Sequence, residues 1–302
     1  MTKRASRESG SKRWYPIGDK EYVSVTTVLQ IISKPALVAW SAKVERELVT
    51  EVSAGLYLDV AGTKPMSRMG WLNSLQSRLG SEKAHKKLLD KAGDIGKQIH
   101  DLIEWTLRAS LMQEPGHPPK IGDKAQWAFM AWEDWRRSVN LKPIFIEQTV
   151  WSDNNCVAGT MDLFAELSGE VKAKHWLTGE TVTKNFDKTP VIVDWKSGKK
   201  VYPESFLQNA AYRSFLREMG HGDPKDGLIV RVPKVETDPE FEVVWCPPEE
   251  ESLPTFYHAL KLWKWQQKYD TWKPEEKPIA PPDNLVPLLE KSLEMVNAPQ
   301  AT

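Results

Sequence analysis

The feature that most limits the fold of this chain is the short segment 191–195, which reads VIVDW and is almost entirely apolar. A strand of this kind is typically buried on both faces, as in sheets that carry helices on either side. It follows a long polar stretch and precedes a helical pattern that opens with Pro203 and closes at Gly220. The segment therefore predicts a central strand in an α/β fold.

The other expected elements fit around this strand, with helices first and strands later. Helical periodicity or start signals predict helices at 24–32, 36–49, 83–111, 123–139, 203–219 and 253–270. Alternating or apolar runs rich in β-formers predict strands at 143–151, 157–167, 191–195, 228–232 and 241–245. The polar residues 168–188 are expected to form a long hairpin connection that carries a small strand pair near residues 175–182. The result is a central mixed sheet flanked by helices, behind a helical N-terminal region.

Length and local composition suggest four parts along the 302 residues. Residues 1–20 are polar and basic and are expected to be a flexible tail. Residues 21–140 form the helical N-terminal region, and residues 141–270 form the α/β core. Residues 271–302 are a Pro-rich C-terminal tail, weakly helical near 285–295.

Composition excludes several classes of protein. No apolar run approaches the about 20 residues of a membrane span, and the N-terminus lacks the apolar part of a signal peptide. Two cysteines, Cys156 and Cys246, cannot bind a four-cysteine iron–sulfur cluster. We therefore expect a cytoplasmic protein without a membrane partner or an iron–sulfur cluster. Lys plus Arg equals Asp plus Glu at 41 each, which at first argues against a nucleic-acid partner.

Four short motifs occur in a definite order along the chain. They are G-x-x-x-H at 96–100 late in the long helix, G-T-x-D at 159–162 on a strand, D-W-K-S-G at 194–198 at a strand end, and Q-x-x-x-Y at 208–212 on the following helix. Each motif alone occurs often by chance. Their order, on the expected elements, is informative.

The two strand motifs predict a metal site. Asp162 and Asp194 are expected on adjacent strands, where two carboxylates repel each other unless a cation lies between them. Oxygen ligands favour Mg²⁺ or Mn²⁺. Lys196 follows Asp194 by two positions and so faces the same side, while the side chain of Trp195 points away and leaves its carbonyl as a further ligand. A plain buried ion pair of Asp194 with Lys196 is the structural alternative, although such pairs stabilise proteins poorly.

The two helical motifs add groups around these strands. His100 covers the Gly96 position one turn earlier, and glycine there lets the helix approach closely, as a metal-binding imidazole requires. Gln208 and Tyr212 share one helix face, which would overlook the site and contact a phosphate or a base. This face can also be simply an amphipathic surface.

Together these motifs resemble the RecB-like branch of the PD-(D/E)xK nuclease superfamily, including its phage-encoded members, over His100 to Tyr212. The resemblance implies a metal-dependent deoxyribonuclease, commonly an exonuclease, acting on DNA ends or single strands in phage recombination, replication or repair. A phage recombination or replication protein is the partner protein that it implies. One or two Mg²⁺ or Mn²⁺ ions would be held by His100, Asp162, Asp194 and the Trp195 carbonyl, with Lys196 as the catalytic lysine. Glu147 matches an acidic position that often precedes G-T-x-D in such proteins.

Three alternatives stay open at this point: a structure- or sequence-specific endonuclease, a non-catalytic DNA-binding or assembly protein with the same fold, and an unrelated metal-binding enzyme. The zero net charge of the chain becomes compatible with DNA binding if the acidic residues of the site bind a metal ion, which cancels their charge locally. Basic residues of the tail, of the 83–97 helix and of 196–200 would then face phosphate. We expect the protein to bind DNA mainly at the metal site, so that the affinity depends only weakly on salt concentration.

Overall fold

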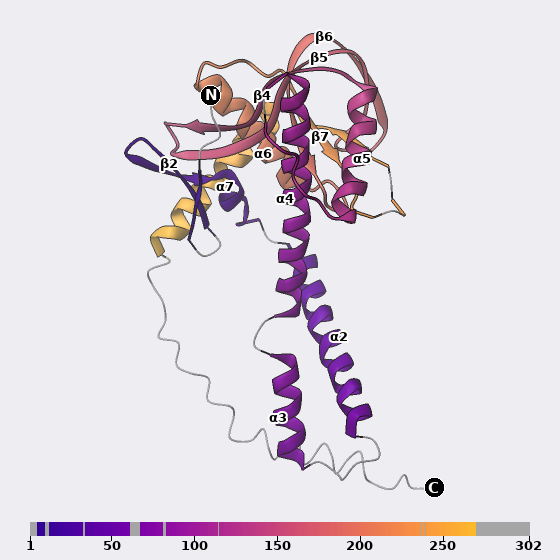
Figure 1. The fold of residues 1–302 in the computed structure, drawn as a ribbon. Coiled ribbons are helices and arrows are strands. Elements are labelled where there is room, and N and C mark those ends of the chain that lie inside the picture. Colours follow the sequence, from indigo (N-terminus) through magenta and orange to yellow (C-terminus); the bar gives the residue numbers. More distant parts are fainter. Residues whose placement is uncertain are drawn as a thin grey trace. The chain divides into compact units, whose positions relative to one another are not determined.

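The computed structural model describes residues 5–9, 12–32, 34–60, 67–80, 83–113, 115–235, 237–238 and 240–269 (Figure 1). The chain divides into two units, Met1–Leu260 and Lys261–Thr302. The whole sheet lies in the first unit. The expected Pro-rich tail, 271–302, lies outside the described residues.

The described part of the chain contains the following elements. The helices are α1 (Val25–Leu29), α2 (Pro35–Val60), α3 (Arg68–Leu79), α4 (Ala84–Ser110), α5 (Asp123–Ser138), α6 (Pro203–Glu218) and α7 (Glu249–Tyr269). The strands are β1 (Arg7–Ser9), β2 (Lys12–Ile17), β3 (Lys20–Ser24), β4 (Asn140–Ser152), β5 (Val157–Lys174), β6 (Thr181–Lys196), β7 (Asp226–Arg231) and β8 (Glu242–Trp245).

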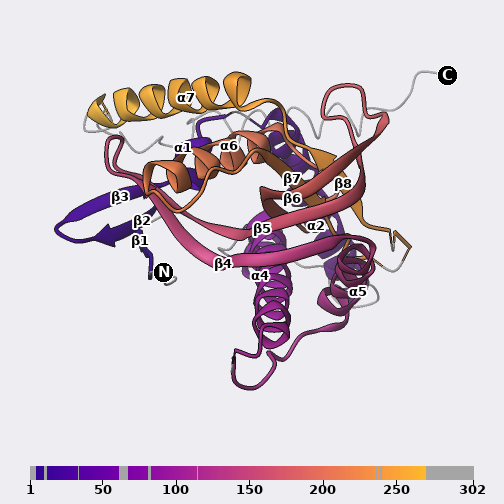
Figure 2. The same cartoon turned by 90° about the horizontal axis from the view of Figure 1, so that it is seen from above.

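The eight strands form one mixed sheet in the order β1-β2-β3-β5-β6-β7-β8, with β4 also paired to β5. Most neighbours are antiparallel, but β6 and β7 run parallel, as do β3 and β5. Helices α4 and α5 lie on one side of this sheet and α6 lies on the other (Figure 2). The predicted architecture, a mixed sheet flanked by helices in an α/β fold, is therefore confirmed.

The apolar end of β6 forms the centre of the core, as its sequence predicted. Val191, Ile192 and Val193 have no exposed surface. Trp195 lies against two tryptophans of α5, with ring centroids 6.0 Å from Trp132 and 5.3 Å from Trp135, both edge-on. Aromatic pairs in this geometry add to the free energy gained from burial alone. Residues 191–195 are thus covered on both faces by helices.

The expectation of a flexible basic tail over residues 1–20 is wrong for the part described there. Residues of β1 and β2 form an antiparallel ribbon with β3, and β3 joins β5 in parallel. Tyr15 and Ile17 are buried, and Gly18 supplies the left-handed residue of the turn into β3 with φ +58°. The charges of this segment had hidden its alternation of buried and exposed residues. They are paired across the ribbon, as in Arg7 with Glu21 at 2.7 Å.

Several boundaries differ from expectation, each because of tertiary pairing. The connection 168–188 is a continuation of the β5–β6 hairpin, which pairs out to Lys174 and Thr181. Helix α3 occupies residues for which the sequence predicted nothing definite. Helix α7 begins before Pro254 and includes it. No helix in the described ranges is both long enough and apolar enough to cross a membrane.

The tryptophan cluster gives a test of this core. Trp135 is 1% exposed, and its Nε1–H has no hydrogen-bond partner among the described residues. We expect Trp135→Ala to lower the free energy of unfolding by about 3–5 kcal/mol. Trp135→Phe should cost much less, because ring packing is retained and the unpaired N–H is removed. Urea unfolding measures both, and Trp265→Ala, at a 57% exposed position, is the control expected to change little.

Candidate metal centre

Three acidic side chains form a row across neighbouring strands of the sheet. In the β4–β5 register, the residue pairs on either side of Glu147 set it opposite Asp162. The last pair of the β5–β6 ladder sets Asp194 next to Asp162 on the other side. Glu147 and Asp162 are each 7% exposed, and Asp194 is 1% exposed. Three carboxylates are thus placed side by side at a depth where unpaired charge is costly.

A histidine from the helical region reaches this row. Nδ1 of His100, on α4, lies 3.4 Å from Oδ1 of Asp162 and 3.5 Å from Oε1 of Glu147. One potential ligand atom of each of these three residues lies within 4.8 Å of the others. Carboxylate oxygens are ligands that Mg²⁺ and Mn²⁺ favour, and an imidazole nitrogen is a ligand for transition-metal ions, so the donor set fits a divalent cation.

The pKa shifts of the site residues show that the acidic row favours positive charge nearby. Burial alone would lower the pKa of His100, but Asp162 and Glu147 outweigh it and raise that pKa to about 10. Burial raises the pKa of Asp194, with Lys196 opposing and Asp162 adding to the rise. Oδ2 of Asp194 is buried, and the ammonium of Lys196 lies 2.6 Å from it as an ion-pair partner. The row therefore draws positive charge from His100 and Lys196, and a cation between the carboxylates would add to it.

Lys196 lies on the same side of β6 as Asp194, as the strand period predicted. Its Nζ lies 2.6 Å from Oδ2 of Asp194 and donates to Oε1 of Gln208 at 3.2 Å. Nε2 of Gln208 in turn donates to the hydroxyl of Tyr212 at 2.9 Å. The face of α6 that carries Gln208 and Tyr212 therefore does overlook the acidic row.

Trp195 takes part through its backbone. Its side chain packs against α5, and its N–H donates to Oδ2 of Asp162 at 2.7 Å. This bond and the charges of His100 and Lys196 lower the pKa of Asp162 despite its burial, which acts in the opposite direction and is the largest influence. The assignment of the Trp195 carbonyl as a metal ligand stays a prediction.

Two glycines of the motifs are explained by close approach. A Cβ at Gly159 would lie 2.4 Å from Cε1 of Tyr212, so this glycine makes room for the tyrosine ring on β5. A Cβ at Gly96 would lie 3.2 Å from Oγ of Ser197, where α4 passes the end of β6. The spacing of the motifs thus reflects the contact of α4 and α6 with the site strands.

Two features of the site escaped sequence reasoning. The hydroxyl of Tyr15, within the supposed tail, lies 3.2 Å from Oγ1 of Thr160 in the G-T-x-D motif. Glu147 has a left-handed backbone with φ +47°, which is unfavourable for a glutamate and recurs at functional sites. The alternation in W-Y-P-I could have revealed Tyr15. No local signal marks the backbone of Glu147.

Comparison with known proteins adds no assignment: no family model matches the chain, and no curated protein matches its sequence.

Metal binding can be tested without assuming any activity. We expect Mn²⁺ to bind to the purified chain, as measured by isothermal titration calorimetry. Because His100 supplies a ligand atom, His100→Ala should weaken binding at least as much as loss of an outer-shell partner does, roughly 10–100-fold. His85→Ala is the matched control on the same helix, since His85 pairs with Glu45 at 2.6 Å outside the site. Equal Mn²⁺ affinity in the wild type and in His100→Ala would contradict the assignment.

The contact between Gly159 and Tyr212 can be tested by a double-mutant cycle. Gly159→Ala alone should lower the free energy of unfolding by about 1–3 kcal/mol, because the new Cβ overlaps the tyrosine ring. The same change in a Tyr212→Ala background should cost far less, since the ring is gone. Gly93→Ala, on α4 with no atom within 4 Å of the added Cβ, is the control. Additive costs in the cycle would show that the contact is absent.

Proposed function

We propose that this protein is a metal-dependent deoxyribonuclease of the PD-(D/E)xK kind, related to its RecB-like branch. The observation that carries the proposal is the convergence of five side chains from four elements on one spot. Glu147, Asp162 and Asp194 form the acidic row, Lys196 extends it on β6, and His100 reaches it from α4. Residues so far apart in the chain converge at a cost in buried charge, which a purely structural role does not repay.

The residues divide into two tasks. His100, Glu147, Asp162 and Asp194, with the Trp195 carbonyl, would hold Mg²⁺ or Mn²⁺. When bound, such an ion lowers the pKa of a water molecule and neutralises charge on a phosphate. The protein itself keeps these oxygens in place. For Asp162, the backbone N–H of Trp195 does so by donating a hydrogen bond to the carboxylate.

Lys196 would act on the scissile phosphate. An ammonium carries three N–H donors, and the contacts with Asp194 and Gln208 account for two of them. The third is available to a phosphate oxygen or to the attacking water, and a charge fixed in this way stabilises the negative charge that grows in the transition state. Gln208 and Tyr212 hold the lysine from α6 and serve as positioning residues.

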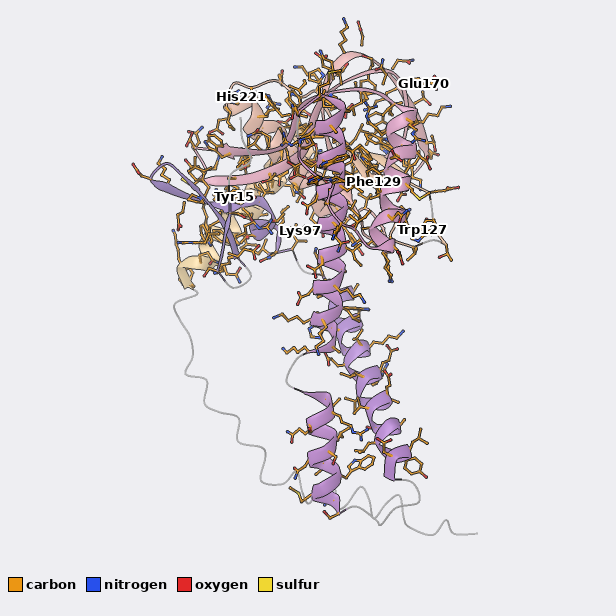
Figure 3. The ribbon with its side chains drawn as sticks, in the orientation of Figure 1. Tyr15, Lys97, Trp127, Phe129, Glu170 and His221 are labelled. Atoms are coloured by element: carbon orange, nitrogen blue, oxygen red, sulfur yellow. The ribbon has the colours of Figure 1, made fainter. Side chains whose placement is uncertain are left out.

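The surroundings of the site suit a polyanion. Lys199 and Lys200 follow the end of β6 and are exposed, and Lys97 is exposed on α4 one turn before His100. Lys199 and Lys200 lie close in sequence to Asp194, and Lys97, labelled in Figure 3, lies close to His100. Their number is modest, in line with a protein that binds DNA mainly where it cuts.

Activity and its direction can be read from one experiment. End-labelled single- and double-stranded DNA is incubated with the protein and Mg²⁺, Mn²⁺ or a chelator, and the products are separated on a gel. We expect metal-dependent shortening from an end, as the family resemblance implies, and no reaction with chelator. A discrete ladder from covalently closed circles would instead identify an endonuclease.

The decisive variant is Lys196→Ala. We expect it to lower the cleavage rate by a factor of about 10² or more, because a preorganised charge is lost, while Mn²⁺ and DNA binding persist. Lys188→Ala is the matched control, because Lys188 lies earlier on the same strand and is exposed. Cleavage by Lys196→Ala at the wild-type rate would exclude the proposed mechanism. DNA binding without cleavage by the wild type would favour a binding or assembly role.

A further inference from the structure

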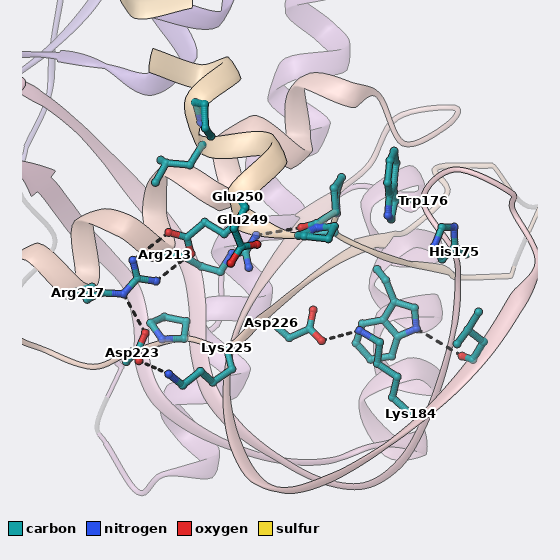
Figure 4. A pocket seen from close by; sticks show the side chains of 18 residues that line it. His175, Trp176, Lys184, Arg213, Arg217, Asp223, Lys225, Asp226, Glu249 and Glu250 are labelled. Carbon is teal, nitrogen blue, oxygen red and sulfur yellow. Dashed lines mark hydrogen bonds and ion pairs between the residues drawn. The ribbon is translucent and has the colours of Figure 1, made fainter. Parts of the chain in front are cut away.

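A second pocket, of about 800 Å³, lies away from the acidic row (Figure 4). It is lined by residues of the β5–β6 hairpin, the start of β7, the end of β8, the second half of α6 and the start of α7. On β7 the pocket residue is Asp226, which pairs with Val191, whereas Lys196 at the metal centre pairs with Arg231 at the other end of the strand. The pocket is therefore a separate site, and its size suits a small molecule.

Most charges in this pocket are neutralised by one another. Arg217 makes a bidentate ion pair with Glu249, with two hydrogen bonds of 2.9 Å. It makes a single hydrogen bond to Asp223, also at 2.9 Å. Lys184 pairs with Asp226 at 2.7 Å. These groups hold the walls together, and Figure 4 shows their contacts as dashed lines. They leave little free charge to attract a ligand.

Arg213 is the exception. It is 3% exposed and lines the pocket, yet within the described ranges only its Nη2 makes a hydrogen bond, to the Pro247 carbonyl at 3.3 Å. Its Nε is buried with no partner, and no carboxylate pairs with it among the residues that the structure describes. A guanidinium offers five N–H donors, and a buried one that uses a single donor is energetically costly. An anion in the pocket would remove this cost, and a phosphate matches the guanidinium in shape and charge.

Aromatic rings border the same pocket. Trp176 is half-buried at its edge and stacks on His175, with centroids 5.6 Å apart and 27° between the planes. Indole rings stack readily on nucleobases, whatever their sequence. Four carboxylates also line the pocket, among them the exposed Glu250, and they disfavour a ligand with several anionic groups. The lining thus suits one phosphate joined to one flat ring.

The pocket has no chemistry of its own to offer such a ligand. Burial raises the pKa of the Cys246 thiol, so that this cysteine stays protonated and is a poor nucleophile at neutral pH. The lining suits reversible binding.

We propose that this pocket binds a nucleoside monophosphate, with the phosphate on Arg213 and the base against Trp176. The inference goes beyond the proposed nuclease function and does not depend on it. It identifies a nucleotide site on a different face of the helix that carries Gln208 and Tyr212.

The test titrates the full chain with deoxyadenosine 5′-monophosphate by calorimetry, in the presence of a chelator so that the metal centre cannot contribute. Inorganic phosphate and deoxyadenosine are the partial ligands. We expect Arg213→Gln to weaken nucleotide binding by about tenfold or more, as loss of a charged hydrogen bond does. Trp176→Ala, at a half-exposed position that tolerates change, should weaken nucleotide binding and leave phosphate binding unchanged.

Two control variants separate this site from the metal centre. Lys196→Ala should leave nucleotide binding intact, and Glu250→Gln should leave it intact or strengthen it, because one carboxylate is removed. Absence of nucleotide binding, or affinity unaffected by both Arg213→Gln and Trp176→Ala, would overturn the proposal. Loss of binding in Lys196→Ala would place the nucleotide at the metal centre and overturn it as well. Phosphate binding with no gain from the base would refute the nucleotide assignment.

Discussion

Mutual repulsion of three buried carboxylates is the constraint on which the rest of this structure depends. Glu147, Asp162 and Asp194 lie on three adjacent strands in one row, and each is almost fully buried, so water does little to screen their charges. Such a row persists only if positive charge is brought to it. The ammonium of Lys196 and the imidazole of His100 supply part of that charge, and a divalent cation would supply the rest.

The placing of the helices follows from this need. Helix α4 must bring His100 to the row, and its close passage by the end of β6 at Gly96 makes that approach possible. Helix α6 must support Lys196 through Gln208, and the Tyr212 ring occupies the space left by Gly159. The glycines of the motifs are thus requirements of packing, while the charged residues are requirements of chemistry. The site needs both kinds, because one without the other leaves it incomplete.

This division explains which parts of the molecule could be predicted from sequence. The strand period alone placed Lys196 beside Asp194, and the helical period placed Gln208 with Tyr212, because both relations are local. The ribbon β1–β3 was not predicted, because its charged residues masked a weak alternation of apolar and polar positions. Its pairing with β5 makes it part of the sheet. The left-handed backbone of Glu147 is likewise imposed by its neighbours across the sheet. The contact of Arg213 with Pro247 joins residues that no sequence pattern relates.

Helix α6 shows most clearly why burial and polarity must be interpreted together. A helix that packs on a sheet usually buries apolar side chains, yet α6 also buries Ser205, Asn209 and Arg213. One of its faces, through Gln208 and Tyr212, meets the metal centre, whereas Asn209 donates to the Ile192 carbonyl of the sheet and Arg213 lines the second pocket. Oδ1 of Asn209 and Nε of Arg213 are both without a hydrogen-bond partner within the described ranges. Arg213 lines that pocket, so an anion bound there would satisfy a buried donor that the described residues leave unpaired.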